Sequence, residues 1–263
     1  MTPGESPKGK SEVMDIALHK KFLIVGASGD LGFCVLEMLS RYPVWIGAHS
    51  HRNKARFEKF LQRKTPAKLK IFNGDISSQK NSAKLVRSFI QWAGGIDGLM
   101  QLSGSVKEPK NWDTLDQDSW DRDIAVNLSG PFFLAQEAMK HMRRKGGRII
   151  LTSTASVVHG GGRNSMAYGA AKAGIECITK GLAREGAKHN ILVNAIAPGF
   201  IKTQFHLKQM KRTQKDIMAR ANLVPLKRAG QPEDVANMVI YLLSPMSNYL
   251  TGLVIPISGG DWL

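Results

Sequence analysis

The chain has 263 residues, 43% of them hydrophobic and 22% charged, which excludes wholesale disorder and is enough for one large folded core. Its two cysteines exclude a disulfide framework and a cysteine-rich zinc site, and without a membrane-spanning apolar run or a signal peptide we expect a cytoplasmic protein. The net charge of +16 is unusual and indicates an acidic partner, a nucleic acid or a generally basic proteome.

Residues 1–20 combine proline, glycine and alternating charges, which predicts a flexible N-terminal tail. Beyond this tail, short apolar runs alternate with helical patterns. The expected strands are residues 22–26, 44–48, 69–72, 96–102, 148–152, 191–196 and 252–257. The expected helices are residues 31–39, 53–63, 83–92, 118–144, 165–187 and 232–243. This alternation predicts a doubly wound α/β fold, in which helices cover both faces of a parallel sheet of about seven strands, and residues 21–263 form a single domain.

A glycine-rich loop joins the first expected strand to the first expected helix. Its sequence is Gly26-Ala-Ser28-Gly29-Asp30-Leu31-Gly32. Glycine lets the backbone turn tightly and approach a phosphate closely, and the start of a helix offers N–H groups and the positive end of its dipole. In this strand–loop–helix context the spacing predicts a dinucleotide site, and the alternative is a plain tight turn.

The residues after the second expected strand favour NADP(H), although NAD(H) remains open. An NAD site usually has an acidic residue there, whereas this chain has Ser50, His51 and Arg52 with no acid. A basic cluster suits a 2′-phosphate, and the alternative is a solvated helix start. Asp75 and Ile76 end the third expected strand and are candidates for contacting the adenine, unless Asp75 caps the following helix.

Tyr168 and Lys172 are the strongest local feature, because a spacing of four places both side chains on one helix face. An ammonium beside a phenol favours the phenolate and lowers the phenol pKa from about 10. The pair therefore predicts a tyrosine that acts as a general acid or base near neutral pH, and the alternative is a solvent-facing pair.

Together these motifs resemble the compact form of the short-chain dehydrogenase/reductase family, and most closely its 3-oxoacyl-(acyl-carrier-protein) reductases. The resemblance covers roughly residues 20–263. Besides the glycine loop, Asp75, Tyr168 and Lys172, it rests on residues 96–99, 126–127, 148–153, 193–203, 225–236 and 249–260.

The resemblance implies a Rossmann fold and an NADP(H)-dependent oxidoreductase. Its expected reaction is the reduction of a ketone, such as a 3-oxoacyl thioester of fatty acid biosynthesis, to a secondary alcohol. Tyr168 would pass a proton to the substrate oxygen, Lys172 would hold the nicotinamide ribose and lower the Tyr168 pKa, and Asn127 would hold a water in a proton relay. Residues of about 200–225, here called the lid segment, would form a mobile lid over the substrate.

The implied cofactor-binding residues extend from the glycine loop to the lid segment. They are Gly26, Ser28, Gly29, Asp30, Leu31, Gly32, Ser50, His51, Arg52, Asp75, Ile76, Ser103, Gly104, Tyr168, Lys172, Pro198, Gly199, Ile201 and Thr203. The implied catalytic residues are Tyr168, Lys172, Asn127, Thr154 and Ser153, and no metal site is expected.

Two positions depart from the family pattern. Asp30 stands where compact members usually have glycine, and its carboxylate would repel a pyrophosphate unless it caps the helix or points outward. The usual offset for the catalytic hydroxyl lands on Ala155, whereas counting from the strand start favours Thr154, then Ser153, then Ser156.

The basic residues are concentrated in three segments, residues 51–70, 140–148 and 201–230. We expect the first on the adenosine side, and the other two beside the mouth of the active site, where they suit an acidic carrier protein or a coenzyme A thioester. No aromatic platform favours nucleic-acid binding.

By resemblance we expect a homotetramer or homodimer. The alternatives are an NADP-binding regulatory protein with little redox activity and an alcohol dehydrogenase with another small substrate.

Overall fold

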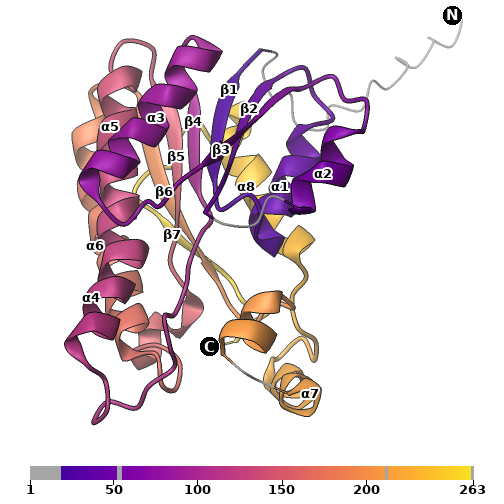
Figure 1. The fold of residues 1–263 in the computed structure, drawn as a ribbon, viewed down its shortest axis with the longest axis vertical. Helices are drawn as coiled ribbons and strands as arrows, with labels where there is room; N and C mark the ends of the chain where they lie inside the picture. The colour runs from indigo at the N-terminus through magenta and orange to yellow at the C-terminus, as the bar shows by residue number, and fades with distance from the viewer. Residues whose placement is uncertain (1–18, 52–54, 211–212, 262–263) are drawn as a thin grey trace, which may run out of the picture.

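The computed structural model describes residues 19–51, 55–210 and 213–261, so the predicted tail and Arg52 lie outside the described residues, except for His19 and Lys20. Seven parallel strands form one sheet in the order β3-β2-β1-β4-β5-β6-β7 (Figure 1). The strands are β1 (Lys21–Val25), β2 (Trp45–Ser50), β3 (Lys68–Asn73), β4 (Gly98–Gln101), β5 (Gly147–Thr152), β6 (Ile191–Pro198) and β7 (Val254–Ile257). This confirms the predicted doubly wound fold.

Helices cover both faces of the sheet (Figure 1). One face carries α1 (Asp30–Leu39), α2 (Ala55–Leu61) and α8 (Pro232–Leu243). The other carries α3 (Gln79–Ala93), α4 (Gln117–Ile124), α5 (Gly130–Met142) and α6 (Met166–Ala187). In the lid segment, α7 (Gln214–Leu223) lies apart from both layers, near the end of the sheet at which the strands finish.

The core is divided into two hydrophobic clusters by the sheet. Alternate side chains of each strand enter opposite clusters, so that Ile24 packs towards α1 and α8 whereas Leu23 and Val25 pack towards α3 and α5. All three side chains are fully buried. A strand buried on both faces must be apolar, which is why residues 22–25 of β1 appear in the sequence as an uninterrupted apolar run.

The single helix expected over residues 118–144 is wrong in one respect. A π-helical turn, Ala125–Ser129, separates α4 from α5, and the N–H of Gly130 bonds the carbonyl of Ala125, five residues back. Pro131 explains the change, because proline has no N–H to donate to the carbonyl of Asn127. Asn127 therefore lies in a widened turn of the kind often found at functional sites.

The other expected elements are present, with ends that differ by a few residues. The helix expected over residues 232–243 has those bounds, whereas β4 starts two residues later than expected and β6 extends to Pro198. Within the described ranges, none of the helices combines the length and the hydropathy that crossing a membrane requires.

The strand order places the motifs at one edge of the sheet. Because all strands are parallel, the glycine loop after β1, Ser103 and Gly104 after β4, Thr154 after β5 and Gly199 after β6 follow the carboxyl ends of adjacent strands. The chain order reverses between β1 and β4, and open α/β sheets bind ligands at such a point.

Candidate active site

A cavity of about 380 Å³ lies at this edge of the sheet. Its walls come from the glycine loop, the ends of β4, β5 and β6, the start of α6 and the lid segment. The expected site residues that line it are Gly29, Asp30, Leu31, Ser103, Gly104, Ser153, Thr154, Tyr168, Lys172, Pro198, Gly199, Ile201 and Thr203.

The three glycines of the loop differ in how much space a side chain would have at each position. Gly26 has a φ of +87°, and a Cβ there would lie 2.6 Å from the backbone nitrogen of Ser103. A Cβ on Gly32 would lie 2.3 Å from the carbonyl oxygen of Gly26. Gly29 has a φ of −75°, lines the cavity, and would bring a Cβ only to 3.3 Å from that same oxygen. Close packing therefore requires glycine at positions 26 and 32. Gly29 instead borders open space in the cavity, and we call Gly29 with the first turn of α1 the phosphate cradle.

This cradle fits the pyrophosphate of a dinucleotide. Gly29 is the N-cap residue of α1 and has no side chain to bond the amides of the first helical turn. Those amides have no acceptor within the helix and face the side from which an anion would approach. The residues present therefore fit the group that the motif predicts.

The expected adenosine end is built from polar residues after β2 and β3. The Ser50 hydroxyl bonds the Ser28 hydroxyl at 3.0 Å, and His51 is exposed. Asp75 does not cap α3, whose N-cap is Ser78. Although partial burial opposes the shift, hydrogen bonds from Ser77 and the nearby Arg122 guanidinium lower the pKa of Asp75 to about 2. Ile76, which follows it, is buried.

Lys172 and Tyr168 lie on α6 and face the cavity. Lys172 is completely buried, and its Nζ donates to the carbonyl of Thr152 at 2.7 Å. The same nitrogen lies 5.5 Å from the centroid of the Tyr168 ring. A Cβ on Gly104 would approach Asn127, Lys172 and Tyr168 to 3.5–3.7 Å, so the backbone after β4 closes this group.

The Asn127 side chain is buried and bonded to backbone atoms. Its Nδ2 donates to the carbonyls of Ser105 at 2.7 Å and Asp123 at 2.9 Å, while its Oδ1 accepts from the Ser105 N–H at 3.0 Å. The side chain therefore fixes the segment after β4 against the π-helical turn. The turn leaves the main-chain carbonyl of Asn127 without an α-helical donor, because that donor would be Pro131.

The expected lowering of the Tyr168 pKa is not observed. Burial raises the pKa of the Tyr168 phenol above its ordinary value, and the charge of Asp123 adds to the effect. Burial also lowers the pKa of Lys172 to about 7. Desolvation opposes the charged form of each group and outweighs the attraction that the spacing of the pair suggested.

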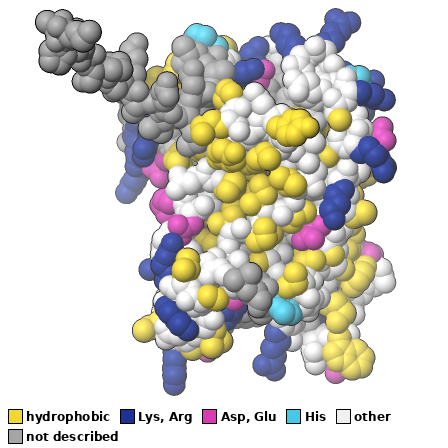
Figure 2. Space-filling model, turned by 180° about the vertical axis from the view of Figure 1, so that it is seen from behind, with side chains coloured by type: hydrophobic (Ala, Val, Ile, Leu, Met, Phe, Trp, Pro, Cys, Tyr) yellow, Lys and Arg dark blue, Asp and Glu magenta, His cyan; other side chains and the backbone are white. Residues whose placement is uncertain are grey.

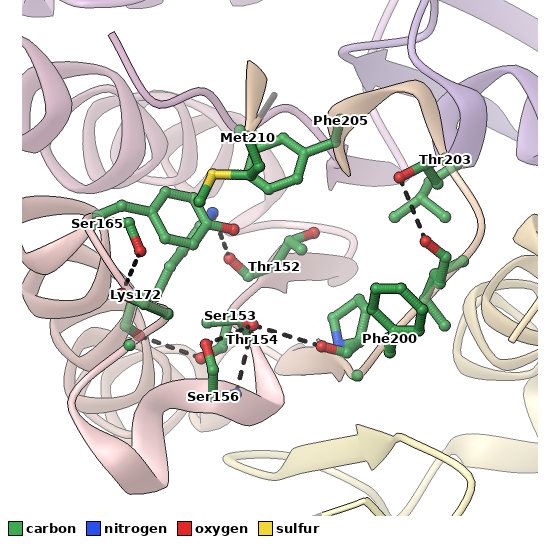
Figure 3. Close-up of a pocket in the computed structure, with 18 of the residues that line it drawn as sticks. Thr152, Ser153, Thr154, Ser156, Ser165, Lys172, Phe200, Thr203, Phe205 and Met210 are labelled. Atoms are coloured by element: carbon green, nitrogen blue, oxygen red, sulfur yellow. Dashed lines mark hydrogen bonds between the residues drawn. The ribbon is translucent and has the colours of Figure 1, made fainter. Parts of the chain in front are cut away.

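Of the hydroxyls after β5, Ser153 is turned into the protein. It is buried and donates to Glu176 at 2.7 Å and to the Lys172 carbonyl at 3.2 Å. Thr154 and Ser156 line the cavity with their hydroxyls 3.2 Å apart, and the Thr154 hydroxyl lies 3.5 Å from the Pro198 carbonyl (Figure 3). The geometry therefore favours Thr154 and Ser156 over Ser153 as groups available to a ligand.

The lid segment forms the opposite wall. Phe205 and Met210 lie together on the far side of the cavity from Thr154 and Ser156 (Figure 3). The Phe205 ring centroid is 5.8 Å from that of Tyr168. Arg163, Arg220 and Asp261 also line the cavity. The sequence analysis missed these three, because no local pattern distinguishes them from other polar surface residues.

The expected position of one basic segment is wrong. Residues 140–148 end α5 and begin β5, whereas the cavity contacts the other end of that strand at Thr152. This segment therefore lies at the edge of the sheet opposite the cavity. Of the described basic residues of the lid segment, Arg220 lines the cavity, where it pairs with Asp261.

Comparison with known proteins agrees with the fold and the motifs. A profile of the family described as "Enoyl-(Acyl carrier protein) reductase" matches residues 42–261. The acetoacetyl-CoA reductase of Allochromatium vinosum is 30% identical over 90% of this chain and 96% of its own length. The 3-oxoacyl-[acyl-carrier-protein] reductase FabG of Aquifex aeolicus is 31% identical over 94% of this chain and 99% of its own length.

A solved structure extends the agreement to three dimensions. Levodione reductase superposes with a TM-score of 0.84 at 25% identity, over 93% of this chain and 98% of that one. Since the family profile and the relatives span nearly the whole chain and the fold agrees as well, the chain belongs to the short-chain dehydrogenase/reductase family of oxidoreductases that use a nicotinamide nucleotide.

Proposed function

We propose that the protein is an NADP(H)-dependent ketone reductase acting on a 3-oxoacyl thioester. One observation carries the proposal: Gly29 of the phosphate cradle, the Tyr168–Lys172 pair and the hydroxyls of Thr154 and Ser156 line a single cavity. An anion site, a proton donor and carbonyl-binding hydroxyls are the groups that reduction of a ketone requires. The two relatives named as acetoacetyl-CoA and 3-oxoacyl-carrier reductases support the thioester class.

The cofactor would lie along the carboxyl edge of the sheet, with its pyrophosphate at Gly29 and the first turn of α1. Pro198, Gly199, Ile201 and Thr203 would enclose its nicotinamide end, and when bound it would supply the hydride. Ser50 and His51 support a preference for the phosphorylated form, because they stand where an NAD site usually has an acidic residue.

Tyr168 would protonate the substrate oxygen. Because burial raises its pKa, the phenol keeps its proton at neutral pH, which suits a group that acts as an acid in the direction of reduction. The Thr154 hydroxyl, with Ser156 beside it, would donate to the same carbonyl oxygen and hold it in place. After proton transfer, Lys172 would stabilise the phenolate, and it regains its own charge readily because its pKa is about 7.

The substrate end of the cavity combines apolar and cationic walls. Phe200, Phe205 and Met210 suit an acyl chain, while Arg163 suits the anionic groups of a coenzyme A or carrier-protein thioester, and the charge of Arg220 is paired with Asp261. We also propose that copies of the chain associate. In support, Figure 2 shows hydrophobic side chains gathered at the centre of one face, and Met246, Tyr249 and Leu253, close to the edge strand β7, are exposed.

The activity test is NADPH oxidation with a short 3-oxoacyl thioester, measured beside NADH. We expect turnover that prefers NADPH, and Tyr168→Phe should lower kcat by about 10²–10⁴ while NADPH binding stays near that of the wild type. Full turnover by Tyr168→Phe would contradict the assignment. Cofactor binding without turnover on this thioester and on a panel of ketones and alcohols would favour the regulatory reading.

The hydroxyl assignment is tested by three substitutions. Thr154→Val keeps the shape but removes the hydroxyl, so we expect kcat to fall about 10²–10³. Ser156→Ala should have a smaller effect on kcat. Ser153→Ala should act mainly on the free energy of unfolding, lowering it by about 1–2 kcal/mol, because it removes the partly buried hydrogen bond from Ser153 to Glu176. A larger loss of kcat from Ser153→Ala than from Thr154→Val would overturn the assignment.

Gly29→Ala and Gly32→Ala form a matched pair for the cradle. The Gly29 methyl group would lie 3.3 Å from the Gly26 carbonyl oxygen, a contact that a shift of a few tenths of an ångström relieves, so the free energy of unfolding should change by less than about 1 kcal/mol while NADPH binding weakens at least tenfold. The Gly32 methyl group would clash with backbone, so this variant should lose about 1–3 kcal/mol of stability. Calorimetry and urea unfolding measure the two effects. Unchanged NADPH affinity in Gly29→Ala would place the pyrophosphate elsewhere.

Burial of Lys172 predicts a dependence of stability on pH in the ligand-free protein. Its pKa is about 7 when folded and about 10.4 when unfolded, so the unfolded chain binds more protons between these values. Stability should therefore rise with pH in this window by up to about 1.4 kcal/mol per pH unit, relative to a Lys172→Met variant. Urea unfolding from pH 7 to 9.5 measures it, and parallel curves for both proteins would refute a depressed pKa.

A further inference from the structure

The carboxylate of Asp30 joins three segments that are far apart in the sequence. Asp30 is the first residue of α1, directly after the phosphate cradle. Its Oδ1 accepts from Arg56 of α2 at 2.7 Å, and its Oδ2 accepts from the backbone N–H of Gln204 in the lid segment at 2.7 Å. One side chain thus connects the cofactor loop, the neighbouring helix and the lid segment.

Arg56 holds the carboxylate in place and compensates its charge. The guanidinium also donates to the Ser28 carbonyl at 3.3 Å and lies 4.4 Å from the centroid of the Phe33 ring. The Asp30 side chain is 17% exposed and that of Arg56 is 35% exposed, so the pair is charge-assisted and partly sheltered from water. The repulsion of a pyrophosphate that the sequence suggested is therefore reduced, and the carboxylate has a fixed direction.

On the lid side, the bond lies where the segment leaves the body of the protein. Ile201 still pairs with Gly230, and the Lys202 N–H donates to the Gly230 carbonyl at 2.8 Å. Gln204 then starts the π-helical turn Phe205–Gln209. The residue after the bonded amide is Phe205, whose ring lies against Tyr168. A contact at Gln204 therefore fixes the start of the turn that carries Phe205.

We propose that Asp30 is a positioning residue that ties the lid segment to the cofactor loop and so places Phe205 over Tyr168. The carboxylate acts through the lid and takes no part in proton or hydride transfer. Without this bond the lid segment would leave the cavity more often, and the lid segment would then be more exposed to solvent. The effect expected on catalysis rests on the proposed function, whereas the effect on the lid segment does not.

Four substitutions isolate the bond. Asp30→Ala removes the acceptor, and Asp30→Asn keeps a carbonyl oxygen in the same place without the charge. Gln204→Pro removes the amide proton, and the φ of −63° at Gln204 is one that proline adopts. Gln204→Ala keeps the amide and is the matched control for loss of the exposed side chain. Circular dichroism and thermal unfolding check that each variant is folded.

Limited trypsin digestion without cofactor or substrate measures how often the lid segment is open to the protease. Lys202 and Lys208 are exposed cleavage sites on either side of Phe205, and Lys180 on α6 is the reference for global opening. We expect Asp30→Ala and Gln204→Pro to speed cleavage at the lid sites about tenfold, the order of effect for a hydrogen bond to a charged group. The double variant should be no faster than either single one, and Asp30→Asn and Gln204→Ala should be slower than both.

Cleavage at the wild-type rate in both disrupting variants, or additive acceleration in the double variant, would overturn the proposal. Kinetics provide the second readout. Asp30→Ala should raise KM for the ketone at least fivefold without weakening NADPH, and Asp30→Asn should restore part of the loss. Weakened NADPH binding with unchanged cleavage would instead make Asp30 a direct cofactor ligand. If the wild type reduces no ketone, the proposed function fails while the digestion still decides the role of Asp30.

Discussion

The hydrogen bond from Lys172 to the carbonyl of Thr152 is the contact on which the site depends. It joins α6 to the end of β5 at 2.7 Å, through a side chain that is completely buried. Tyr168 lies one helical turn before Lys172, and Thr154 lies two residues after Thr152. The bond therefore holds the proposed proton donor, Tyr168, and the proposed carbonyl-binding hydroxyl, Thr154, in fixed positions relative to each other.

Burial of this pair also explains why its protonation differs from the simple expectation. An ammonium beside a phenol in water would favour the phenolate, but burial disfavours the charged form of each group, which raises the pKa of Tyr168 and lowers that of Lys172. The two titrations are coupled, since a phenolate formed during the reaction favours a protonated Lys172. Near neutral pH Tyr168 therefore keeps its proton, while Lys172 is divided between its neutral and charged forms.

The sequence predicted what depends on local pattern. Apolar runs located the strands, and glycine spacing and the Tyr168–Lys172 spacing located the two ends of the cavity. Orientation depended on distant partners and was not predictable. Ser153 is turned inward by Glu176, 23 residues away, and Asp30 meets Gln204, 174 residues away. The π-helical turn did have a local signal in Pro131. The position of residues 140–148 could have been deduced as well, because a segment that precedes a parallel strand lies at the edge opposite the site.

The departure at Asp30 follows from how the loop is packed. A Cβ added at Gly26 or Gly32 would lie too close to backbone atoms, and Gly29 borders the space that an anion would occupy. Position 30 differs, because its side chain leaves the loop towards α2 and the lid segment. A side chain at this position therefore leaves the turn between Gly26 and Gly32 undisturbed and reaches Gln204 of the lid segment. Glycine therefore occupies the loop positions where the backbone comes close to other backbone atoms or to the cavity. Asp30 is not restricted in this way, and its side chain can bond the lid segment.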